Sequence, residues 1–192
     1  MKTIYSLLFS KKKTKISPDT LWRYYKTYCD SLTKLIESLL ASPYNKSSGI
    51  QFLFNLYNHC MTKWTKLITF YNNSHQIEIY FRHMLLLAIN KATFYLRLSL
   101  PNTSALIIDS VTEIYEAAKT STNPHTQHIC GRYIAAKANL FMEYSMMRKA
   151  IDYYMLALKH FHSEIKVIEK KYTNLQLIER HTRELHTVQR NV

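Results

Sequence analysis

The chain has 192 residues, of which 47% are hydrophobic and 20% charged, a composition typical of a folded globular protein. Its two glycines and four prolines are too few for the tight hairpins of a sheet or for a phosphate-cradling loop, which argues against a nucleotide-binding α/β enzyme. The formal charge of +13 would suit nucleic acid, anionic lipid or an acidic protein as partner.

Apolar residues recur at helical spacing along almost the whole chain. We expect a basic, flexible segment over residues 1–17 and a first helix from Pro18 to a loop at 42–48. Further helices are predicted over about 49–71, 75–98, 103–119 and 126–144. A last helical stretch starts near 147 and breaks gently near 172–174.

No segment sustains the alternation of a strand. The predicted fold is therefore all-α: an antiparallel helical bundle or short helical-repeat array of about six to seven helices. It forms one domain over 18–192, in which 18–100 and 102–192 are the candidate subdomains. The helix over 75–98 is apolar on most of its surface, which predicts a central position in the bundle. The inward stripes of the first two helices are predicted to be Leu21, Tyr25, Cys29, Leu32, Ile36 and Leu39, and Ile50, Phe54, Tyr57, Met61, Trp64 and Ile68.

Small and aromatic residues share a regular spacing between residues 134 and 161. Alanine allows two antiparallel helices to approach closely, and aromatic rings then fill the groove between neighbouring turns. We therefore predict a tightly packed helical hairpin. Its packing residues are Ala138, Phe141, Ala150, Tyr154, Ala157 and Phe161.

The hairpin of a tetratricopeptide repeat resembles the series Ala138, Phe141, Ala150, Tyr154 and Ala157. The second helix of a microtubule-interacting-and-trafficking domain equally resembles the series Ala150, Tyr154, Ala157 and Phe161. Lys137 and His162 depart from the repeat pattern, and no second copy follows at its period of about 34 residues. Any close helix crossing would give the same spacing, so that explanation stays open. Both families are protein-binding modules, so the resemblance implies a groove that takes a partner helix or peptide.

Basic residues are concentrated in the first half, where residues 1–101 hold 14 lysines and arginines against 4 acids, and residues 102–192 hold 12 against 9. Some alternate with aromatic residues around Trp22–Tyr28 and Lys63–Lys66, as in proteins that stack bases beside phosphate contacts. The candidate basic surface comprises Lys11, Lys12, Lys13, Lys15, Arg23, Lys26, Lys63 and Lys66.

No catalytic motif is found, so we expect no enzyme activity and no cofactor. His125, His128 and Cys130 lack a fourth ligand at standard spacing, and His160 and His162 point apart on a helix. We therefore expect no metal site, and histidines that lie on the surface or cap helices. Three cysteines without a C-x-x-C pair, and the absence of a secretory or membrane-spanning pattern, predict a cytoplasmic or nuclear location.

These observations favour a non-catalytic interaction module or adaptor that binds a partner helix or peptide in a groove between helices. The alternative is a helical nucleic-acid-binding protein that uses the basic first half.

Overall fold

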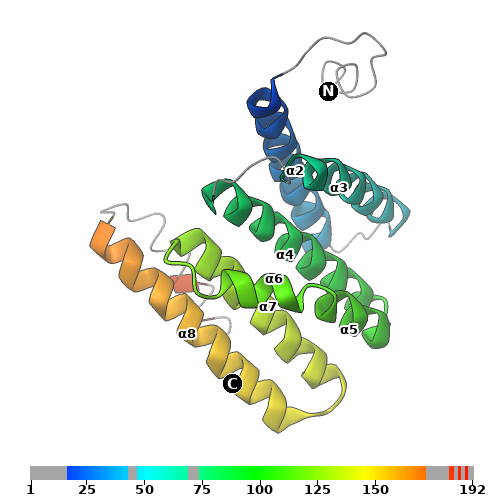
Figure 1. The fold of residues 1–192 in the computed structure, drawn as a ribbon. Helices are drawn as coiled ribbons and strands as arrows, with labels where there is room; N and C mark the ends of the chain where they lie inside the picture. Colours follow the sequence, from blue (N-terminus) through cyan, green and yellow to red (C-terminus); the bar gives the residue numbers. More distant parts are fainter. Residues whose placement is uncertain are drawn as a thin grey trace. The chain divides into compact units, whose positions relative to one another are not determined.

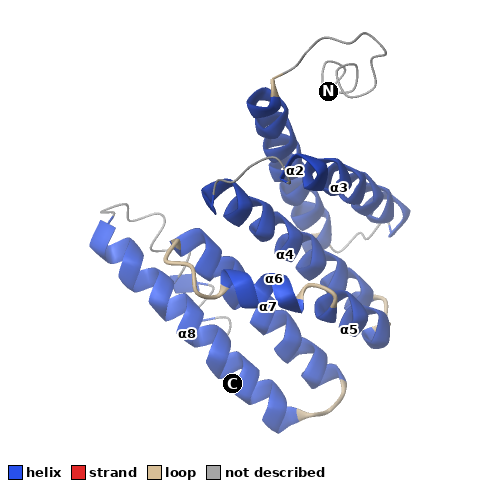
Figure 2. Cartoon of the chain, in the orientation of Figure 1, coloured by secondary structure: helices blue, strands red, loops and turns tan. Residues whose placement is uncertain are grey.

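The computed structural model of the chain describes residues 17–42, 47–68, 74–171, 182, 183, 186 and 189, with side chains up to residue 166 and at the last four positions. Within these residues it is all-α, with seven helices and no strand (Figure 2). None of the described helices is long and apolar enough to cross a membrane. The segment 1–16, the end of the second predicted helix and the break predicted at 172–174 lie outside the described residues.

Two compact units make up the chain, Met1–Asn73 and Ser74–Val192. Residues 100–102, where we placed the subdomain boundary, lie inside the second unit, between helices α4 and α5. Pro101 marks the start of a new helix there, but α4 and α5 pack against each other. A proline indicates where a helix begins or ends, but it does not indicate whether the two helices that it separates share a core.

The first unit contains helices α2 (Pro18–Ala41) and α3 (Ser47–Ile68), which pack against each other. The Ser17 side chain accepts a hydrogen bond from the Thr20 backbone N–H, and Pro18 occupies the first turn, so α2 begins where its sequence predicts. Its buried face is turned slightly from the predicted stripe: Trp22 and Leu40 are buried, whereas Leu21 and Leu39 are half-exposed.

Aromatic packing explains this rotation of α2. The Trp22 ring meets the fully buried Trp64 ring edge-on, with centroids 5.7 Å apart and an interplanar angle of 81°. A tryptophan buries more apolar area than a leucine, so the helix face that includes Trp22 is favoured. Farther along, the Thr33 and Tyr57 hydroxyls lie 2.9 Å apart inside the unit and satisfy each other.

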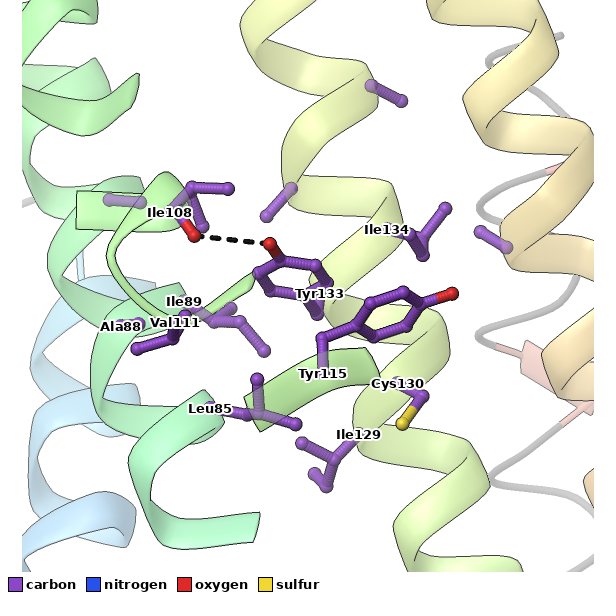
Figure 3. Close-up of a cluster of buried hydrophobic side chains, with 14 of the residues drawn as sticks. Leu85, Ala88, Ile89, Ile108, Val111, Tyr115, Ile129, Cys130, Tyr133 and Ile134 are labelled. Carbon is purple, nitrogen blue, oxygen red and sulfur yellow. Dashed lines mark hydrogen bonds between the residues drawn. The ribbon is translucent and has the colours of Figure 1, made fainter. Parts of the chain in front are cut away.

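The second unit contains α4 (Ser74–Arg97), α5 (Pro101–Asp109), α6 (Thr112–Ala118), α7 (Pro124–Glu143) and α8 (Met147–Lys171) (Figure 1). Helix α4 packs against α5, α6 and α7, and the α7–α8 interface is the most extensive of the unit. One buried cluster holds these helices together (Figure 3). Its α4 members are Leu85, Ala88, Ile89 and Ala92.

The single helix predicted over 103–119 is wrong, because α5 ends at Asp109 and α6 begins at Thr112. The Tyr133 hydroxyl donates to the Ile108 carbonyl at 3.1 Å, and it lies 3.0 Å from the Thr112 hydroxyl (Figure 3). A continuous helix would pair that carbonyl with the backbone N–H of residue 112. The run Asp109-Ser110-Val111-Thr112 has low helix propensity, which lowers the cost of the break.

Candidate protein-interaction surface

Helices α7 and α8 form a hairpin joined by the turn at residues 144–146 (Figure 1). Ala138, Ala150 and Ala157 are fully buried, and their small side chains let the two backbones approach. Tyr154 and Phe161 are buried between them. The hydroxyl of the buried Tyr154 side chain is satisfied, because it donates a hydrogen bond to the Asn139 side-chain oxygen at 2.5 Å.

The end of this hairpin next to its turn, which we call the turn end, holds Phe141. Its half-buried ring packs against Tyr153 with centroids 5.0 Å apart, and the Lys149 ammonium lies 5.7 Å from its centre. Lys137, which departs from the repeat pattern, is also accommodated. Its ammonium lies 3.4 Å from the Asp109 carboxylate and 5.4 Å from the centre of the Tyr133 ring.

A glycine contributes to the same crossing and was not among the predicted packing residues. A Cβ atom on Gly131 would lie 2.6 Å from the Phe161 ring, closer than any real contact. Gly131 therefore extends the series of small residues on α7 toward its N-terminus. One of only two glycines, placed in a predicted helix where glycine is unfavourable, was the signal that could have revealed it.

The opposite end of the hairpin, which we call the polar end, is held by side-chain hydrogen bonds. The Gln127 amide nitrogen donates to the carbonyls of Lys119 and Ser121 at 2.9 and 2.5 Å. Its oxygen therefore faces the His160 Nδ1 atom, 2.7 Å away, and the Tyr115 hydroxyl lies 3.1 Å from the His160 Nε2 atom. In this arrangement Nδ1 donates to Gln127 and Nε2 accepts from Tyr115.

Two carboxylates complete the polar end. The Glu164 side chain is fully buried, and its Oε2 atom lies 3.1 Å from Nδ1 of the buried His128. Glu78 accepts hydrogen bonds from the hydroxyls of Ser121 and Thr126, which fixes the loop before α7. Burial raises the pKa of Glu78, but these hydrogen bonds and the nearby Arg82 together lower it by more than burial raises it, so the net shift is downward.

The expectation of surface or capping histidines is wrong for His128, which lies in the core, and for His160, which is half-buried in the network. His125 and His162 are exposed. No group of three histidine, cysteine, aspartate or glutamate side chains in the described part of the chain could hold a metal ion. The polar end thus joins side chains of α4, α6, α7 and α8 through hydrogen bonds, an arrangement suited to fixing helix positions.

Two turns of this unit have the same unusual backbone. Ser99 after α4 and Ser145 after α7 both have φ of 57°, a left-handed conformation that favours glycine. Each turn is closed by a hydrogen bond from the following residue to the carbonyl five positions earlier, Leu100 to Tyr95 and Met146 to Phe141. Both Leu100 and Met146 stay exposed.

The outer face of α8 carries the most distinctive surface of the described hairpin. At 100° per residue, Arg148, Lys159 and Lys166 fall within about 20° of one another and form a row about 27 Å long. All three are exposed. Met155, which is 48% exposed, lies in line with this row, Leu156, 37% exposed, lies about 80° to one side of Arg148, and Met147 at the start of the row is 56% exposed. We call these six residues the α8 surface.

The residues of the predicted basic surface are only partly placed. Lys11, Lys12, Lys13 and Lys15 lie outside the described residues. On α2, Arg23 is exposed, whereas the Lys26 ammonium is paired with the Asp30 carboxylate at 2.8 Å. On α3, Lys63 and Lys66 are both exposed and lie one turn apart. Trp22 and Trp64, which would stack on bases, are instead buried against each other.

Comparison with known proteins gives no neighbour from which a function could be transferred. No protein-family description matches the chain, and no curated protein or solved structure matches it either.

Proposed function

We propose that the chain is a non-catalytic protein-interaction module, and that the α8 surface binds an acidic amphipathic helix of a partner protein. The observation that carries this proposal is the combination, on one exposed helix face, of a basic row with the large apolar side chains of Met155 in line with it and Leu156 beside it. Asp152 is the one exposed acid between Met147 and Lys166.

The chemistry of the surface indicates the chemistry of the partner. Exposed methionine and leucine side chains give apolar contact area, and methionine adapts to irregular partner surfaces. A partner helix with leucines or isoleucines at positions i, i+3, i+4 and i+7 would cover Met155 and Leu156. Glutamates or aspartates beside that stripe would meet Arg148, Lys159 and Lys166, which sets orientation and speeds encounter.

The hairpin beneath is suited to present such a surface. Its inner face is occupied by Ala150, Tyr154, Ala157 and Phe161, so α8 is anchored along the length that carries the exposed residues. A binding surface on a rigid helix loses little conformational entropy when the partner arrives. The resemblance to two families of protein-binding hairpins points the same way.

The test measures binding of two fluorescent probes by anisotropy: a designed amphipathic peptide with leucines on one face and glutamates beside them, and a single-stranded 20-mer DNA. Reversal of the α8 row, R148E with K159E and K166E, is expected to weaken peptide binding by at least about tenfold. A matched triple reversal in the first unit, R23E with K63E and K66E, should leave it unchanged.

Equal peptide binding by both triple variants, or none by the wild-type chain, would contradict the proposal. The alternative nucleic-acid function predicts that the DNA binds with a steep salt dependence, and that only the first-unit reversal abolishes it. Among the aromatic residues at 22–28 and 63–66, burial of Trp22 and Trp64 leaves Tyr24 and Tyr28, both half-exposed, able to contact bases.

A further inference from the structure

Two cysteines from different helices meet inside the first unit. Cys29 of α2 and Cys60 of α3 have their sulfur atoms 3.3 Å apart, at a sequence separation of 31. Both side chains are buried, at 0% and 3% exposure. The Cys60 thiol also lies 4.0 Å from the Tyr25 carbonyl, and the Cys29 sulfur lies 3.8 Å from the Met61 sulfur.

We propose that Cys29 and Cys60 are a dithiol–disulfide pair, which a small-molecule disulfide such as oxidised glutathione converts into a covalent link between α2 and α3. The sulfurs must approach by a little more than 1 Å to reach the bond length of about 2.05 Å. Rotation about the two Cα–Cβ bonds contributes to this approach, and the facing helices already direct both sulfurs toward each other.

The exchange balances without any further reactant. One cysteine thiolate attacks a sulfur of the glutathione disulfide, which breaks its S–S bond and releases one glutathione thiolate. The second cysteine thiolate then attacks the protein sulfur of the mixed disulfide and releases the second glutathione. The two protons lost by Cys29 and Cys60 are taken up by the two glutathione thiolates.

The surroundings favour a neutral product over a charged one. Burial raises the pKa of the Cys29 thiol strongly, and the neighbouring Cys60 raises it further. A soft metal ion would suit two thiolates and the Met61 thioether, but it would keep negative charge in this apolar interior. A disulfide carries no charge. Its formation is slow in the closed unit, since the reaction needs a thiolate, and is fastest when α2 and α3 separate transiently.

Cys130 provides an internal control. It is fully buried in the second unit, and burial raises its pKa to about 12, with a smaller contribution from Glu78. Its surroundings thus resemble those of Cys29, but within the described residues the sulfur–sulfur contact between cysteines joins Cys29 and Cys60 and does not involve Cys130. The proposal therefore assigns two of three cysteines to a bond and leaves one thiol free.

The experiment equilibrates the full chain in glutathione redox buffers, folded and in denaturant, starting from both the reduced and the oxidised form. Acid quenching and alkylation under denaturing conditions then count free thiols by mass. We expect three labels on the reduced chain and one on the oxidised chain, with peptide mapping identifying the Cys29–Cys60 link. Half-oxidation of the folded chain should need an oxidant ratio on the order of a hundredfold lower than in denaturant.

The variant C130S should keep the same titration with no label left after oxidation, whereas the folded C60S variant, whose two thiols are buried and have no cysteine partner, should keep two labels at every ratio. By thermodynamic linkage, the oxidant ratio at half-oxidation in denaturant, divided by the oxidant ratio at half-oxidation of the folded chain, equals the factor by which the bond stabilises the fold. A ratio of one or less, three labels at all redox ratios, or a map that joins Cys130 to either cysteine would overturn the proposal.

Discussion

The two ends of the α7–α8 hairpin are stabilised by different means. At the turn end, Ala138 and Ala150 let the helices pack closely, and the connection uses the left-handed Ser145. At the polar end, Gln127 and His160 link the helices through hydrogen bonds. Apolar packing is non-directional and tolerates small shifts, whereas buried hydrogen bonds demand matched geometry. The polar end therefore fixes the relative position of α6, α7 and α8, and the turn end contributes mainly close contact.

The contact between Gly131 and Phe161, which lies next to the polar end, should show the largest effect. Phe161→Ala removes a buried ring that packs on Gly131 and is expected to cost about 3–5 kcal/mol in the free energy of unfolding, measured with urea. Gly131→Ala should cost about 1–3 kcal/mol in the wild-type chain, because the new Cβ meets the ring.

A double-mutant cycle sharpens that prediction. In the Phe161→Ala background, Gly131→Ala should become neutral or stabilising, since the clash is gone and alanine is the better helix former. Equal effects of Gly131→Ala in both backgrounds would show that the close approach to Phe161 does not constrain the crossing.

The polar end is tested by Gln127→Ala, which removes the side-chain partner of the Lys119 and Ser121 carbonyls and of the His160 Nδ1 atom. We expect a loss of about 2–3 kcal/mol by urea unfolding, in the range for unsatisfied buried groups. Gln127→Glu keeps the acceptor for His160 but loses the donors to the loop. If the hydrogen bond to His160 contributes separately, the free energy of unfolding of Gln127→Glu should lie between those of the wild type and Gln127→Ala. A loss below 0.5 kcal/mol (about the effect of an ordinary surface change) would contradict the assigned role.

Substitutions in the two left-handed turns should raise the stability of the second unit instead of lowering it. Ser145→Gly and Ser99→Gly each relieve a left-handed conformation and are expected to stabilise the second unit by about 1 kcal/mol. The two gains should add, because the substitutions lie in separate turns. Ser145→Ala keeps the Cβ atom, so thermal unfolding should show no comparable rise in Tm for this control.

The smallest effect concerns pH. Burial lowers the pKa of His160 from its ordinary value of 6.5, and the positive charge of Lys119 lowers it further. The unfolded chain therefore binds this proton more readily, so the stability from neutral His160 is present above pH 6.5 and declines as the pH falls below it. Urea midpoints at pH 7.5 and 5.5 should differ more for the wild type than for His160→Asn. If the urea midpoint changed equally with pH in the wild type and in His160→Asn, His160 would not contribute to the pH dependence of stability.

Helical periodicity predicted the all-α class and most helix positions, because each amphipathic helix needs an apolar stripe at its own local spacing. Ser17 with Pro18 determined the start of α2 locally. The break between α5 and α6 was not predicted, since Tyr133 reaches Ile108 from a helix 25 residues away in sequence. Likewise, single-helix periodicity could not show that Cys29 faces Cys60.

The sequence by itself determined which segments are helical and that small and aromatic residues at 138–161 would mark a close crossing, because propensity, capping and periodicity act over a few residues. Only the tertiary structure decided which polar groups are buried together. Glu164 and His128 look like ordinary surface residues in the sequence, yet they meet in the core. Burying a polar group is favourable only with a partner, and that partner comes from another helix, so the outcome depends on how the helices pack.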